Sequence, residues 1–67
     1  MEANKMVHTI EYNGRELVRI YENPNYSWGY SYTLLVEGHG VHHGISPHRL
    51  TLVLARAEKK GGTVYSW

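Results

Sequence analysis

The chain of 67 residues contains no cysteine, so neither disulfide bonds nor thiolate metal sites can hold its fold together. It also has no long apolar run, because the longest, Leu52–Ala55, falls far short of the roughly 20 residues that span a bilayer. The N-terminal Met-Glu-Ala-Asn-Lys-Met lacks the basic start and apolar core of a signal peptide. These absences favour a soluble cytoplasmic protein with no membrane partner.

An excess of charge of one sign is missing as well. Seven basic and six acidic residues leave a net charge of +1, which is too small for strong nonspecific attraction to phosphate backbones. Phenylalanine is absent, but there are six tyrosines and two tryptophans, whose polar tips suit a partly wet surface. Two interpretations remain open: the tyrosines are half-buried and pack along a small sheet for structural reasons, or they form an aromatic recognition surface.

The length predicts a single domain, residues 1–67, with a small core. Its central stretch, Trp28–Glu37, has a large apolar or aromatic residue at every second position: Trp28, Tyr30, Tyr32, Leu34 and Val36. A period of two predicts a strand with one buried face. The intervening residues are expected on a more exposed face: Gly29, Ser31, Thr33, Leu35 and Glu37.

Asn13-Gly14 predicts a two-residue type I′ turn between strands Met6–Tyr12 and Arg15–Tyr21, because both central positions need positive φ. The expected cross-strand pairs are Ile10 with Leu17, Val7 with Ile20, Thr9 with Val18, and the like-charged Glu11 with Glu16. A register shifted by one would separate the glutamates but oppose Ile10 to Glu16 and Val7 to Arg19, so the two-residue turn is preferred. The Asn-Pro-Asn in Glu22–Tyr26 predicts a loop.

Ser46-Pro47 predicts the start of a helix that runs to about Lys60, with Gly61 as its left-handed cap. Helical spacing places the core face at Leu50, Val53, Leu54 and Ala57. An adjacent stripe holds Arg49, Arg56 and Lys60, and Leu52 projects away from the core. Short strands are predicted at Val41–Ile45 and Thr63–Trp67.

The expected fold is therefore α+β: a β-hairpin, a central strand, a short strand, a helix and a final strand. The helix packs on one face of a small, mostly antiparallel sheet. The uncovered edge strands favour a homodimer or another partner.

Four histidines fall within ten residues: His39, His42, His43 and His48. Imidazole is a common transition-metal ligand. In an extended Val41–Ile45, however, His42 and His43 would point to opposite faces, and Glu37 is the only carboxylate nearby. His39, His42 and His43 stay candidates for an adventitious metal contact, and no metal site or other cofactor is expected.

Catalytic motifs are missing. The chain has no nucleophile elbow, paired-carboxylate motif or phosphate-binding glycine loop. We therefore expect no enzymatic activity and assign no catalytic residue.

Basic and aromatic side chains suggest binding instead. Arg15 and Arg19 are expected on one face of the hairpin with Tyr12 and Tyr21, and the helix stripe offers a second basic patch. Four glutamates dilute this charge, and no RNA-recognition or helix-turn-helix signature occurs. A small nucleic-acid-binding regulator therefore stays the alternative to a protein-binding module, which uses aromatics and arginine as anchors. The candidate partner-binding residues are Tyr12, Arg15, Arg19, Tyr21, Tyr26, Trp28, Arg49, Leu52 and Arg56.

The order strand, strand, helix, strand from Trp28 to Trp67, with Ser-Pro opening the helix and Lys-Lys-Gly-Gly closing it, resembles two groups of small α+β proteins. One is the antitoxin modules with a partial ribonuclease-H-like fold, and the other is the phage-encoded inhibitors of the anti-CRISPR type. The resemblance covers about 40 residues and rests on architecture, so no functional residue is carried over. It implies a non-catalytic protein, encoded by a phage or mobile element, that binds and blocks a larger protein or nucleoprotein.

Overall fold

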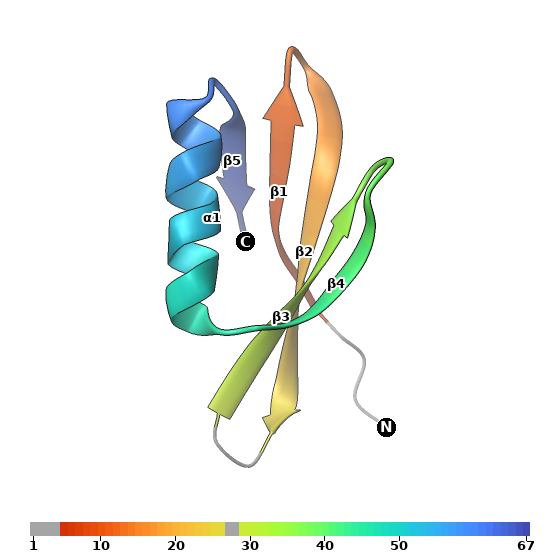
Figure 1. The fold of residues 1–67 in the computed structure, drawn as a ribbon, viewed down its shortest axis with the longest axis vertical. Helices are drawn as coiled ribbons and strands as arrows, with labels where there is room; N and C mark the ends of the chain where they lie inside the picture. The colour runs from red at the N-terminus through yellow and green to blue at the C-terminus, as the bar shows by residue number, and fades with distance from the viewer. Residues whose placement is uncertain (1–4, 27–28) are drawn as a thin grey trace.

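The computed structural model describes residues 5–26 and 29–67. It contains a five-stranded antiparallel sheet and one helix that packs on it (Figure 1). The elements are β1 (Lys5–Tyr12), β2 (Arg15–Tyr26), β3 (Gly29–Val36), β4 (Gly40–Ile45), α1 (Pro47–Lys59) and β5 (Thr63–Ser66). The strand order is β4-β3-β2-β1-β5, so β4 and β5 form the edges. The expected α+β fold, including its element order, is confirmed.

The β1–β2 hairpin keeps the predicted turn but not the predicted register beyond it. Asn13 and Gly14 have φ values of 54° and 77°, and Glu11 lies opposite Glu16 as expected. The other three predicted pairs are wrong: the observed pairs are Ile10 with Val18, Thr9 with Arg19, and His8 with Ile20.

A bulge at Leu17 causes this change, because β2 there contributes one extra residue between Glu16 and Val18. In an uninterrupted register, Leu17 would face Ile10, and Val18 and Ile20 would turn to the opposite face. The bulge moves Val18 and Ile20 to the face that Ile10 already occupies. Ile10 and Ile20 become the most deeply buried apolar side chains, 1% and 0% exposed.

The predicted loop at Glu22–Tyr26 is also wrong, because β2 continues through it to Tyr26. Asn23 pairs with Ser31 and Tyr26 with Gly29, with an irregularity between the two pairs. Pro24 lies in that irregularity, where its missing N–H interrupts no regular ladder.

The alternation expected around β3 is confirmed on one face for Tyr32, Leu34 and Val36 and is wrong in part on the other. Trp28 lies outside the described residues, and the side chain of Tyr30 is not among those described. Leu34 is buried, and Tyr32 and Val36 pack against the core. Ser31 and Thr33, however, are only 6% and 7% exposed. The Thr33 hydroxyl accepts a hydrogen bond from Asn23 Nδ2 (2.8 Å) and lies 3.2 Å from His43 Nδ1, so this small residue links β2, β3 and β4.

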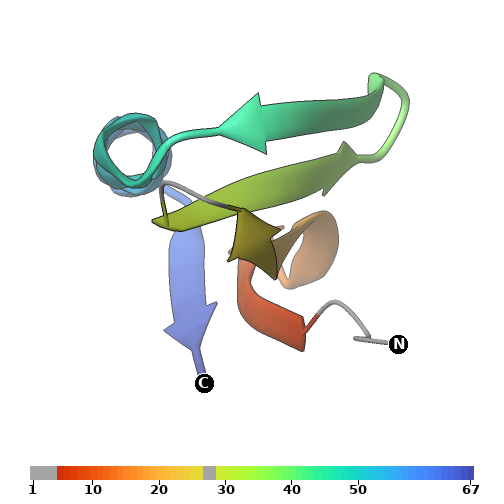
Figure 2. The same ribbon diagram turned by 90° about the horizontal axis from the view of Figure 1, so that it is seen from below.

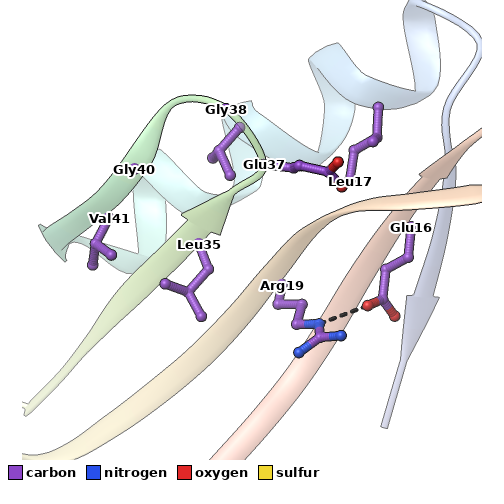
Figure 3. Close-up of a pocket in the computed structure, with 9 residues that line it drawn as sticks. Glu16, Leu17, Arg19, Leu35, Glu37, Gly38, Gly40 and Val41 are labelled. Atoms are coloured by element: carbon purple, nitrogen blue, oxygen red, sulfur yellow. Dashed lines mark hydrogen bonds and ion pairs between the residues drawn. The ribbon is translucent and has the colours of Figure 1, made fainter.

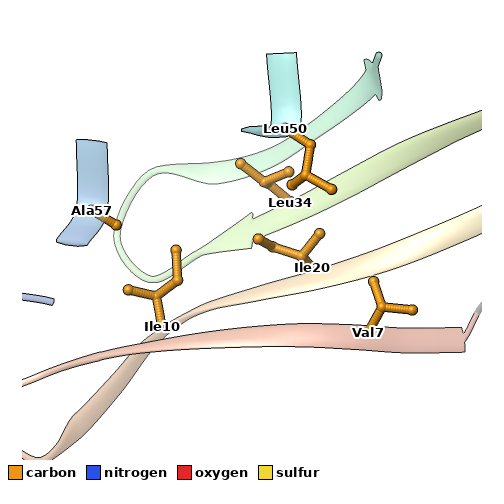
Figure 4. Close-up of a cluster of buried hydrophobic side chains, with 6 residues drawn as sticks. All are labelled: Val7, Ile10, Ile20, Leu34, Leu50 and Ala57. Atoms are coloured by element: carbon orange, nitrogen blue, oxygen red, sulfur yellow. The ribbon is translucent and has the colours of Figure 1, made fainter. Parts of the chain in front are cut away.

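Helix α1 begins as predicted, since the Arg49 N–H donates to the Ser46 hydroxyl at 3.2 Å and Pro47 is its first residue. Gly61 has a φ of 90° directly after the C-cap, which confirms the left-handed cap. Leu50 and Ala57 are buried, and Val53 and Leu54 are partly buried against them. Figure 4 shows the core that these elements enclose: Val7, Ile10, Ile20, Leu34, Leu50 and Ala57.

Candidate functional site

A single helix cannot cover a sheet of five strands. An α-helix is about 10–12 Å wide with its side chains, whereas five strands spaced at about 4.8 Å span roughly 19 Å between the outer strand axes. Helix α1 packs on β3 and β5. Figure 2 shows that the β3–β4 hairpin reaches away from α1, so that its turn lies at the end distant from the helix. Apolar residues on the helix-facing side of the sheet are therefore left partly open.

This opening is a cleft of about 580 Å³ between α1 and the sheet. We name it the α1 cleft; its lining residues are Ile10, Tyr12, Val18, Leu34, Val36, Arg49, Leu52, Val53, Arg56, Ala57 and Lys60. Val18 and Val36 pair across β2 and β3 and form part of the floor. The volume lies within the range of about 300–1,000 Å³ that is typical of binding sites.

The charged residues of the α1 cleft all carry the same sign. Arg49 and Arg56 come from α1 and Lys60 is its C-cap residue, and we call the three the basic rim. No acidic residue lines the cleft, and none of the three has an ion pair within residues 5–26 and 29–67. Arg49 and Arg56 are seven residues apart, which corresponds to about 10.5 Å along the helix axis. The cleft thus offers a row of cations beside an apolar floor.

Leu52 is the apolar side chain that connects this floor to the surface. It is 51% exposed on α1, between the two arginines of the basic rim. Other large apolar side chains of the described chain are as exposed: Val41 (50%), Tyr65 (45%) and Trp67 (68%). None of these three lines the α1 cleft, so Leu52 alone combines high exposure with unpaired cations.

The hairpin arginines, in contrast, are already paired. Arg15 forms an ion pair with Glu37, and Arg19 Nε donates to Glu16 Oε1 at 2.6 Å. The hydrogen bond and the charge of Glu16 raise the pKa of Arg19. Both arginines remain exposed, but their charge is balanced locally and adds little to the attraction of an anionic partner.

The single hairpin face expected from Tyr12, Arg15, Arg19 and Tyr21 is wrong. Tyr12 lines the α1 cleft on the helix side of the sheet. Arg19 and Tyr21 lie on the opposite face, because the bulge at Leu17 turns them away from it. Of the nine predicted partner-binding residues, the structure brings Tyr12, Arg49, Leu52 and Arg56 together around one cleft.

The opposite face of the sheet has a shallower hollow of about 370 Å³ near the β3–β4 turn. Figure 3 shows Arg19, Leu35 and Val41 pointing to the same side from three neighbouring strands. Its charged residues are Glu16, Arg19 and Glu37, all of which are in ion pairs. This hollow therefore offers apolar contact without an unbalanced charge.

None of the other predicted binding and metal-ligating residues whose side chains the structure describes lines the α1 cleft. Trp28 lies outside the described residues, and the side chain of Tyr26 is not among those described. His42 lies opposite Leu34, whereas His43 contacts Thr33 on the other face, and His39 is exposed in the β3–β4 turn. Within the described residues, no three histidine, aspartate or glutamate side chains gather closely enough to hold a metal ion.

Sequence reasoning missed the site roles of Val18, Val36 and Val53, which line the α1 cleft beside Leu52. It placed Lys60 on the basic patch of the helix stripe but not among the candidate partner-binding residues. The signal that could have found these residues is a mismatch of number: the chain has more inward-facing apolar residues than one helix of 13 residues covers.

No protein-family model matches this chain, and no curated protein or solved structure is similar enough to count as a match. In the described part of the chain, the helix is too short and too polar to cross a bilayer.

Proposed function

We propose that this protein is a non-catalytic interaction module that binds a larger protein through the α1 cleft and acts by occluding a surface of that protein. The observation that carries the proposal is the combination at this cleft of an apolar floor, the half-exposed Leu52 and three cations without a partner in the described chain. An apolar centre with a polar rim is the usual anatomy of a protein–protein interface.

The energetic argument favours a partner that covers the cleft. Leu52 is 51% exposed, so an apolar contact there would remove further surface from water at about 25 cal/mol per Å². The basic rim adds direction and specificity more than affinity, because exposed ion pairs contribute only about 0.2–1 kcal/mol each. Small size suits occlusion, and it is the mode of action implied by the resemblance to small phage-encoded inhibitors.

Nucleic-acid binding is the second candidate, since the basic rim could contact phosphates. Three contacts would give a salt slope of only about −2.7 for duplex DNA, whereas nucleic-acid-binding proteins that rely on charge make about 6–10 contacts. Tyr12 is the one aromatic side chain of the α1 cleft that could stack on a base. The paired Arg15 and Arg19 add little to this surface.

The test is affinity capture from bacterial lysate with the wild-type chain, Leu52→Asp and Val41→Asp, each with and without nuclease. Leu52 and Val41 are equally exposed, 51% and 50%, but only Leu52 lines the α1 cleft, so Val41→Asp is the matched control. We expect one stoichiometric protein that survives nuclease, is lost with Leu52→Asp and is kept with Val41→Asp. Capture that vanishes with nuclease would instead support the nucleic-acid candidate.

A further inference from the structure

We infer that the α1 cleft receives an acidic amphipathic helix of the partner, which lies along α1 with carboxylates on the basic rim and an apolar side chain against Leu52. The inference rests on the proposed function and adds the chemistry and conformation of the partner's binding element. It follows from three features of the cleft: its charge, its backbone environment and the spacing of its cations.

The charge of the partner element follows from complementarity. Three of the eleven lining residues are basic and none is acidic, although the whole chain has a net charge of only +1. A basic partner element would place like charges beside Arg49 and Arg56, which is unfavourable at such distances. Carboxylates would pair with them, so the element is acidic at the rim.

The conformation follows from the backbone. The sheet part of the cleft comes from β1, β2 and β3, which are all paired on both sides, so no free strand edge lies there. An extended segment in the cleft would leave its own N–H and C=O groups without partners against an apolar floor, and burying such unpaired groups is unfavourable. A helix satisfies these groups internally, and helix-in-groove docking is a recurring recognition mode.

The spacing of the cations gives the pattern of the helix. Arg49, Arg56 and Lys60 stand at positions i, i+7 and i+11. The arginines belong to α1, Lys60 is its C-cap residue, and all three line the cleft. A helix packed alongside would present carboxylates at the same spacing, with a leucine or similar residue between the first two. That residue would meet Leu52 and the valines of the floor.

The probe is a fluorescently labelled synthetic helix of about 18 residues with glutamates at i, i+7 and i+11 and leucines between them, measured by anisotropy against the full chain. The control peptide has the same composition with its glutamates moved to the opposite face. We expect the patterned peptide to bind roughly tenfold more tightly than the control, because only the patterned peptide can form ion pairs with all three cations of the basic rim.

Protein variants test the contact itself. Arg49→Glu/Arg56→Glu should weaken the patterned peptide roughly tenfold and should bind a lysine version of the same peptide better than the wild type does. Lys5→Glu/Lys59→Glu is the matched control, because it reverses the same number of charges at two exposed lysines that do not line the cleft. Circular dichroism confirms that each variant is folded.

Equal affinity for the patterned and control peptides, or an unchanged affinity in Arg49→Glu/Arg56→Glu, would overturn the inference. Displacement of the patterned peptide by dodecanoate at lower concentration than the peptide itself would also overturn it in favour of an acyl ligand. These failures differ from failure of the proposed function, because Leu52-dependent protein capture would persist in the lysate experiment.

Discussion

Two leucines of α1, Leu50 and Leu52, should lose very different amounts of stability on the same substitution. Leu50 is 6% exposed and belongs to the core, whereas Leu52 is 51% exposed at the α1 cleft. Both are changed to alanine in the same helix, so differences in helix propensity, about 0.2 kcal/mol in favour of alanine, are equal for the two. The comparison isolates burial.

The expected magnitudes are well separated. Leu50→Ala leaves a cavity in the core and should cost about 2–5 kcal/mol of unfolding free energy. Leu52→Ala removes a side chain that is already half in water, and it opens space to solvent instead of a cavity, so it should cost less than about 1 kcal/mol. A domain of this length has a total stability of roughly 3–10 kcal/mol, so the first change removes a large part of it.

Urea denaturation followed by circular dichroism checks this. With an m-value near 1 kcal/mol/M, Leu50→Ala should lower the midpoint by about 2 M or more, and Leu52→Ala by less than about 1 M. Should Leu50→Ala fail to fold, Leu50→Met, with an expected cost below about 1.5 kcal/mol, keeps the comparison measurable. An equal or larger loss for Leu52→Ala would refute the orientation of α1 and with it the α1 cleft.

Three further changes test the fold. Gly62→Ala should lower the unfolding free energy by about 1–3 kcal/mol, because the added Cβ would lie 2.9 Å from the Tyr12 ring and 3.0 Å from the Ala57 carbonyl oxygen. An unchanged urea midpoint would contradict this close contact. Gly14→Ala should cost about 1–2 kcal/mol, since its φ of 77° is left-handed, and a neutral result would argue against the type I′ turn. Burial lowers the pKa of His8 below 6.5 and outweighs the opposing charge of Glu22. As the pH falls below about 6.5, the unfolded chain therefore binds a proton at this histidine more readily than the folded chain does. The stability from neutral His8 is therefore present above about pH 6.5 and declines below it, and His8→Gln should reduce the slope of urea midpoints between pH 5 and 7.5.

Local signals in the sequence predicted those elements whose chemistry is local. Ser46-Pro47 and Gly61 define the two ends of α1, because a cap and a left-handed residue act within one turn of the helix. Asn13-Gly14 likewise determined the hairpin turn. The predicted loop at Glu22–Tyr26 was wrong because Asn-Pro-Asn is also compatible with an irregular stretch of strand, and the pairing of Asn23 with Ser31 on β3 decides the outcome.

The candidate site was predicted only where helical spacing determines it. The stripe of Arg49, Arg56 and Lys60 and the outward position of Leu52 follow from a period of 3.6 residues, and the structure confirms both. That Val18 and Val36 would lie beside them depends on where the helix crosses the sheet. This crossing is a tertiary property that no single segment of the sequence encodes.

The bulge at Leu17 links the core to this site, and simple magnitudes show why it forms. A bulge forfeits about one ladder hydrogen bond, a net cost of roughly 0.5–1.5 kcal/mol. On the inner face Val18 takes the place that Leu17 would have held opposite Ile10, so the net gain is the full burial of Ile20. Burying this side chain contributes about 1.5–3 kcal/mol, so the bulged register wins. The same extra residue places Val18 on the floor of the α1 cleft and sends Arg19 to the opposite face beside Glu16. One irregularity therefore explains both why the core closes and why Arg19 is not part of the basic rim.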